Sequence, residues 1–307
     1  MSETKKLGPS KLMIALLVGV PLWLMLSGAM AVFRKATSDE TASPSRDVTR
    51  LVQPVAVPDV IDDLTMIERT LGERNGSSES AATALTRIAA WIDGSLGPSN
   101  AGYQTRRIPG PADWPLIHVS SPGQAKSNAA IWLVTSYDSP PGSCGPEANS
   151  SGLAATLAVA RDLAALETKR PIHFAFIPHA NDPDAPLAET AKALHVLIRT
   201  TAPAVHVLCI EAMGTNPALW ITPRGATTLP ESELNGIGSV VGAEVACLGS
   251  DTDLSSMLAE YGQPATRIAT RELVTPGETN NSETNPLTVA ESAARLSLLV
   301  RRLGDRP

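Results

Sequence analysis

The chain has 307 residues, of which 43% are hydrophobic and 18% are charged. This composition can form the core of an α/β domain and excludes a chain that is disordered throughout. The net charge of −6 and an aromatic content of 4% exclude a basic, base-stacking surface, so we expect no nucleic-acid partner. Three cysteines are too few for a disulfide framework. Cys209 is expected to be buried, whereas a disulfide between Cys144 and Cys247 stays open in an oxidising compartment.

The N-terminal segment predicts a membrane anchor. Residues 12–33 carry no charge, and a helix of this length spans the roughly 30 Å hydrocarbon core of a bilayer. Lysines precede this run, which favours residues 1–11 as a cytoplasmic tail. Residues 34–58 are polar and indicate a flexible stalk, so the folded domain, residues 59–307, lies on the extracytoplasmic side of a single-pass protein. A cleaved signal peptide is the alternative, because an Ala-Met-Ala site ends at Ala31.

Beyond the stalk, helical and strand patterns alternate, which predicts an α/β fold with a mostly parallel central sheet flanked by helices. A polar loop is expected over 276–285. The predicted helices are 60–71, 81–96, 153–166, 186–200, 229–242, 254–261 and 286–303. The predicted strands are 103–108, 116–119, 131–134, 171–177, 205–210, 218–222 and 264–268.

Three of the apolar strands end in polar loops. In parallel sheets ligands bind at the carboxyl ends of the strands. We therefore expect 131–134, 174–177 and 207–210 to be neighbouring central strands. Asp138, His179 and Glu211 would then lie together at one edge of the sheet.

Two segments around the first of these strands carry a family resemblance. The sequence reads TSYDS at 135–139 and GPEANSSG at 145–152, directly before a helix. It resembles the zinc-dependent aminopeptidases, metallopeptidase family twenty-eight, which read roughly AHYDS and GADDNASG there. The Glu73-Arg74-Asn75-Gly76-Ser77 loop and the Gly102-Tyr103 turn resemble the same family. The resemblance implies the fold that the transferrin receptor, nicastrin and glutaminyl cyclases share.

The resemblance also implies a pair of zinc ions held by five ligands, with a glutamate as base, and this sequence departs from that set. Ser136 stands at the first histidine ligand and Ala148 at the bridging aspartate. Ala180 and Asn181 stand at the catalytic and ligating glutamates. Glu211 matches the next aspartate and keeps the charge. Apart from Glu211, these residue types lack the anionic and imidazole donors that zinc requires.

The remaining positions of the family pattern also give no sign of a zinc site. The last histidine of the family should fall near Gly277, but no histidine follows His206. Asp138 survives, and without a histidine to orient we interpret it as a loop-capping carboxylate. The NxSG residues beginning at Asn149 are expected to start the following helix. The pair Asp251 and Asp253 is interpreted as part of a solvated loop.

Two functional hypotheses follow. In the first, the domain binds no metal or cofactor, lacks peptidase activity, and binds a ligand or other membrane or exported proteins. The transferrin-receptor and nicastrin ectodomains resemble this case. In the second, it is an active, zinc-dependent hydrolase with an atypical site formed by Asp138, Glu147, His179 and Glu211. Metal content and peptidase activity discriminate between the two hypotheses.

The anchor gives the first testable prediction. We expect the mature protein to keep residues 12–33 and to remain in the membrane fraction, because the uncharged run exceeds a signal-peptide core in length. N-terminal sequencing of the purified protein checks this. Finding Val32 as the first residue would show cleavage after Ala31 and a soluble exported protein.

Overall fold

A computed structural model describes residues 55–120, 129–164, 166–224, 229, 243–245, 253–271 and 283–305. The predicted tail, anchor and nearly all of the stalk lie outside these ranges. Within them, no helix is both long and apolar enough to cross a membrane. The first described helix begins at Val57, and Val55 packs in the core, so residues just before the predicted boundary at residue 59 also belong to the described domain.

The described helices and strands follow the predicted order. The predicted helix at 229–242 and loop at 276–285 lie mostly outside the described residues. The helices are α2 (Val57–Leu64), η2 (Thr65–Leu71), α3 (Glu79–Leu96), η3 (Pro111–Asp113), η4 (Pro146–Ser150), α4 (Ser151–Leu163), α5 (Leu187–Thr201), α7 (Leu254–Glu260) and α8 (Pro286–Gly304). The strands are β1 (Gln104–Ile108), β2 (Leu116–Ser120), β3 (Ala130–Ser136), β4 (Ile172–Ile177), β5 (Ala204–Ile210), β6 (Leu219–Arg224), β7 (Ala243–Val245) and β8 (Ala265–Ala269).

The described strands form one mixed sheet in the order β1-β2-β4-β3-β5-β8-β6-β7. The centre, β4-β3-β5-β8, is parallel, and antiparallel pairings flank it on both sides. The prediction that β3, β4 and β5 are central neighbours is confirmed. Leu133 of β3 lies between Phe174 of β4 and Leu208 of β5.

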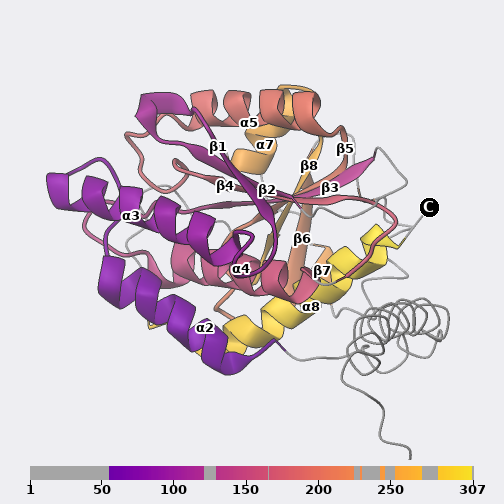
Figure 1. The fold of residues 1–307 in the computed structure, drawn as a ribbon, viewed down its shortest axis with the longest axis horizontal. Helices are drawn as coiled ribbons and strands as arrows, with labels where there is room; N and C mark the ends of the chain where they lie inside the picture. The colour runs from indigo at the N-terminus through magenta and orange to yellow at the C-terminus, as the bar shows by residue number, and fades with distance from the viewer. Residues whose placement is uncertain are drawn as a thin grey trace, which may run out of the picture. The chain divides into compact units, whose positions relative to one another are not determined.

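Helices cover both faces of the sheet (Figure 1). On one face, α5 and α7 pack over Trp132 and Val134 of β3. On the other, α2, α3, α4 and α8 pack over Ile131 and Leu133 of the same strand. Successive side chains of a strand point to opposite faces, so the continuous apolar run of β3 is explained by burial on both sides.

The thiols of Cys144 and Cys209 are free in the structure. Cys209 lies in β5 and is 1% exposed, as its apolar surroundings in the sequence indicate. Cys247 lies outside the described residues, so the possibility of a disulfide with Cys144 stays open.

A buried aromatic stack joins three strands on the face covered by α5. The rings of His118 from β2 and His173 from β4 stack on each other and on Trp132. His118 Nε2 lies 2.9 Å from His173 Nδ1, so one nitrogen carries the shared proton. Burial lowers the pKa of both histidines to about 4, and for His118 the charges of His173 and Arg106 add to this effect.

These pKa values predict a loss of stability in mild acid. Between pH 6.5 and about 4 the unfolded chain binds more protons than the native chain, so the free energy of unfolding must fall as the pH decreases. At pH 5 the loss is on the order of 2 kcal/mol per histidine. Urea unfolding of wild type and of the double variant H118F/H173F, at pH 7 and pH 5, measures it. Equal pH dependence in both proteins would contradict this assignment.

Candidate functional site

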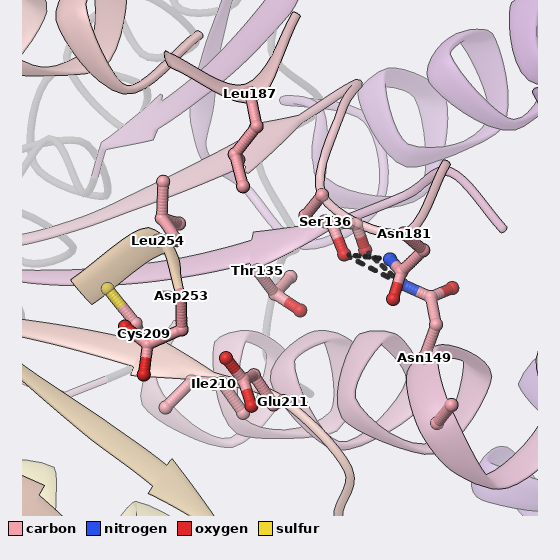
Figure 2. Close-up of a pocket in the computed structure, with 12 residues that line it drawn as sticks. Thr135, Ser136, Asn149, Asn181, Leu187, Cys209, Ile210, Glu211, Asp253 and Leu254 are labelled. Atoms are coloured by element: carbon pink, nitrogen blue, oxygen red, sulfur yellow. Dashed lines mark hydrogen bonds between the residues drawn. The ribbon is translucent and has the colours of Figure 1, made fainter. Parts of the chain in front are cut away.

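A pocket of about 40 Å³ lies at the carboxyl ends of β3, β4 and β5 (Figure 2). Five of the six positions singled out by the family resemblance line it: Ser136, Ala148, Ala180, Asn181 and Glu211. Segments far apart in the sequence therefore meet where the strand pattern predicts. The other lining residues are Thr135, Asn149, Leu187, Cys209, Ile210, Asp253 and Leu254.

One wall of the pocket is a network of uncharged side chains. Ser136 Oγ accepts hydrogen bonds from Asn149 Nδ2 at 2.7 Å and from Asn181 Nδ2 at 2.9 Å. Asn149 was expected to cap the following helix, but α4 begins at Ser151 and has no side-chain cap. Instead Asn149 also donates to the Ser136 carbonyl and accepts from the guanidinium of Arg74, because η4 precedes α4 and turns its side chain inward.

Asp138 lies behind this wall and is not exposed to the pocket. It is 0% exposed, and its carboxylate accepts from the backbone N–H groups of Ala180, Asn181 and Asp182. Burial raises the pKa of Asp138, and these hydrogen bonds oppose the rise. The carboxylate thus caps the loop after β4, in agreement with the interpretation from the sequence, and holds Asn181 in place through a further bond of 3.1 Å.

The opposite wall carries an ion pair between a buried arginine and a partly buried glutamate. Glu211 follows the last residue of β5, and its Oε2 accepts from Arg267 Nε at 2.5 Å. Arg267 comes from the neighbouring strand β8, and its side chain is fully buried. Burial raises the pKa of Glu211, and the charge and hydrogen bond of Arg267 oppose that rise. The one charged residue retained from the family pattern is therefore neutralised by an arginine of the same chain.

Asp253 corrects an interpretation made from the sequence. It was assigned to a solvated loop, but it is 5% exposed and lines the pocket. Its carboxylate accepts from the backbone N–H of Ser256 in a capping box that starts α7, and from Arg224 at 3.0 Å. The Asp-x-x-Ser spacing is the signal that identifies such a cap. Asp251 lies outside the described residues.

The four residues of the alternative hydrolase site do not meet in one pocket. Glu147 accepts from Thr215 and Arg271 instead. His179 is 5% exposed, with Nε2 at 3.3 Å from the Pro111 carbonyl. Neither residue lines the pocket. Only Glu211 of the four does, because Asp138 is buried behind Asn181.

The donor set in the pocket does not fit a zinc centre. Zinc binds thiolate, imidazole and carboxylate groups, usually three or four together. Here the family positions offer a serine hydroxyl, a carboxamide and one carboxylate, which is paired with Arg267. Two further donors of a type that zinc binds line the pocket, but the Asp253 carboxylate is paired with Arg224, and burial raises the pKa of the Cys209 thiol. No group of three histidine, cysteine or acidic residues is arranged to hold a metal ion in the part of the chain that the structure describes.

A close backbone contact explains one glycine of the NxSG segment. A Cβ atom at residue 152 would lie 2.0 Å from the carbonyl oxygen of Glu211. Gly152 therefore allows the first turn of α4 to lie directly on the end of β5. Ser151 strengthens this contact because its hydroxyl accepts from the backbone N–H of Met213. The position of Glu211 thus depends on the start of α4.

The sequence matches no family model and no curated protein. Its structure, by contrast, is similar to many solved structures. The LapA aminopeptidase of Legionella pneumophila is 12% identical, with a TM-score of 0.65 over 86% of this chain and 75% of that one. BSAP, a zinc aminopeptidase from Bacillus subtilis, is 9% identical, with a TM-score of 0.61 over 83% and 97% of the two chains.

The chain has the aminopeptidase fold. A glutaminyl cyclase from Bacteroides thetaiotaomicron shares it, at 12% identity and a TM-score of 0.60 over 81% of this chain and 99% of that one. These likenesses confirm the fold that the TSYDS and GPEANSSG segments indicated. Sequence reasoning missed several residues of the pocket, because their types carry no catalytic signal: Thr135, Leu187, Cys209 and Leu254.

The ion pair at the pocket yields a prediction about stability. Changing Arg267 to Met leaves the Glu211 carboxylate without its hydrogen-bonded counter-ion, so unfolding should become easier by about 3 kcal/mol at pH 7, the lower end for a buried pair because the Glu211 side chain is 21% exposed. The pKa of Glu211 should rise further in this variant. Since the native state then binds the extra proton, the deficit should shrink as the pH falls from 7 towards 5. Urea unfolding at both pH values measures it.

Two controls separate this effect from a simple loss of packing. The double variant R267M/E211Q removes both charges and should recover much of the stability lost in R267M. Arg69→Met breaks an exposed pair with Glu283 and should change stability little. If R267M and the double variant were equally unstable at every pH, the charge of Glu211 would not be the cause.

Proposed function

We propose that this protein is a metal-free, non-hydrolytic domain of the aminopeptidase fold that works as a binding module. The observation that carries the proposal is the chemistry of the pocket at the carboxyl ends of the central strands. Ser136 and Asn181 are hydrogen-bonded to each other, and Glu211 is paired with Arg267. The side chains that would bind metal are replaced by groups that satisfy one another.

The absence of a base supports the same proposal. A metal-bound water needs a carboxylate to take its proton, and Ala180 stands at that position in the family pattern. Within the described residues, the two carboxylates that line the pocket are Glu211 and Asp253, and they are paired with Arg267 and Arg224. The Asp138 carboxylate accepts from the backbone N–H groups of the loop after β4 instead. The pocket keeps its polar lining and its place in the fold, which suits recognition of a ligand without turnover.

Residues 12–33 would hold this domain at a membrane, on the extracytoplasmic side. The stalk over 34–58 would let it reach other membrane proteins or exported ones. This placement rests on the uncharged N-terminal run and on its flanking lysines.

Zinc content and peptidase activity test the proposal directly. We expect far less than one equivalent of zinc per chain by elemental analysis, and no release of amino acids from aminoacyl substrates. The reason is that several ligands act together, and losing even a supporting group costs 10–100-fold in metal affinity. Purified protein should be dialysed against micromolar zinc before both measurements, so that metal lost in purification is replaced.

A single restored ligand provides a further control. Ser136→His returns one imidazole to the pocket, and we expect neither zinc binding nor activity, because Ala148 and Asn181 still lack donors. The proposal fails if wild type holds zinc near one equivalent and shows a peptidase activity that is lost in Glu211→Ala.

A further inference from the structure

The polar groups of the pocket leave a specific set of hydrogen bonds unfilled. Ser136 Oγ accepts two amide N–H bonds, so its hydroxyl is left to donate. Thr135 is 2% exposed and lines the pocket, and its hydroxyl has no hydrogen-bond partner within the described part of the chain. Figure 2 shows Thr135 between Glu211 and the Ser136–Asn181 pair.

Two acceptor oxygens of the pocket, on Asn181 and Glu211, are also unfilled within the described residues. Asn181 donates both of its amide hydrogens, to Ser136 and Asp138, which leaves its Oδ1 as an acceptor. Glu211 binds Arg267 through Oε2, and its Oε1 has no partner among the described residues. Asn149 and Asp253 are different, because their oxygens already accept from Arg74 and from Ser256 and Arg224, respectively.

We propose that this pocket binds a small, uncharged group that both accepts and donates hydrogen bonds, such as a hydroxyl or a carboxamide. An oxygen of the ligand would accept from Ser136, and its O–H or N–H would donate to Glu211 or Asn181. Thr135 would complete the set as donor or acceptor. These atoms face the pocket and are not among the fully enclosed, unpartnered atoms of the described residues, so a ligand with the matching pattern of donors and acceptors can take the place of water at each of them.

The balanced charges of the pocket disfavour ionic ligands. The charge of Glu211 is matched by Arg267, and that of Asp253 by Arg224, so a cation or an anion in the pocket would be uncompensated. An ammonium group also lacks the acceptor that the Ser136 hydroxyl requires. A carboxylate lacks hydrogens and would face Glu211. An uncharged donor–acceptor group is the class that satisfies every unfilled position.

The size of the pocket limits the bound group. A volume of about 40 Å³ is a few times the roughly 10–15 Å³ that one water molecule needs. It suits a group of three or four non-hydrogen atoms. Leu187 and Leu254 also line it, so the rest of the ligand would meet apolar surface. The group is therefore the polar end of a larger molecule or side chain.

Saturation-transfer NMR on the full-length protein in detergent tests the inference with two uncharged probes, acetamide and ethylene glycol. We expect at least one to bind saturably, with a roughly millimolar dissociation constant because so few atoms make contact. Methylammonium and acetate should not displace it. Binding of acetamide alone assigns the carboxamide, and binding of the glycol alone assigns the hydroxyl.

Variants of Thr135 test whether the probes bind in this pocket. Thr135→Val keeps the shape and removes the hydroxyl, and should weaken binding by about tenfold. Thr135→Ser keeps the hydroxyl and should bind within about threefold of wild type. Thr156→Val is the matched control, since that buried hydroxyl bonds to the Gly152 carbonyl within α4 and does not line the pocket.

Three results would overturn the inference. These are no saturable binding of either uncharged probe, displacement by a charged probe, or equal losses in Thr135→Val and Thr135→Ser. The inference rests on the proposed function, but the two fail differently. Zinc near one equivalent defeats the proposed function, whereas a zinc-free protein that ignores both probes defeats only the ligand class.

Discussion

The site depends on one buried cation, the guanidinium of Arg74. It is fully buried and bonds to no carboxylate among the described residues. Its hydrogen bonds go to the carbonyls of Ile67, Gly72, Tyr137 and Cys144 and to the side chains of Asn149 and Ser150. Burial lowers its pKa to about 10, so it stays charged at neutral pH. Six oxygens gathered around one charge tie the end of η2 to the whole segment between β3 and α4. Asn149 and, through it, Ser136 take their positions from this contact.

A second buried arginine, Arg267, differs from Arg74 because its partner is a charged carboxylate. Arg267 meets a carboxylate, and the pair gives the pocket a wall without net charge. Without Arg267, Glu211 would be an uncompensated charge with only 21% of its side chain exposed, which is costly. The polar wall and the ion pair thus leave this part of the pocket polar but without net charge.

The sequence predicted the fold well, because apolar runs such as 131–134 are decided by local pattern and by burial on both faces. It predicted that the loops after β3, β4 and β5 meet, because parallel strands end at a common edge, but of the three residues expected there only Glu211 lines the pocket, and Asp138 and His179 do not. It did not predict Arg267 as a partner of Glu211, since an arginine within a strand gives no sign of a carboxylate 56 residues earlier. Asn149 and Asp253 were misjudged for a similar reason. Their side chains form caps or bridges according to the exact turn, here η4 and the capping box of α7.

The order of the strands in the sheet determines which part of the chain completes the pocket. Strand β8 inserts between β5 and β6, both of which precede it in the chain. It brings Arg267, while α7 just before it brings Asp253. Glu211 therefore gains its Arg267 partner, and the pocket its Asp253 side, only when the segment of α7 and β8 joins the sheet.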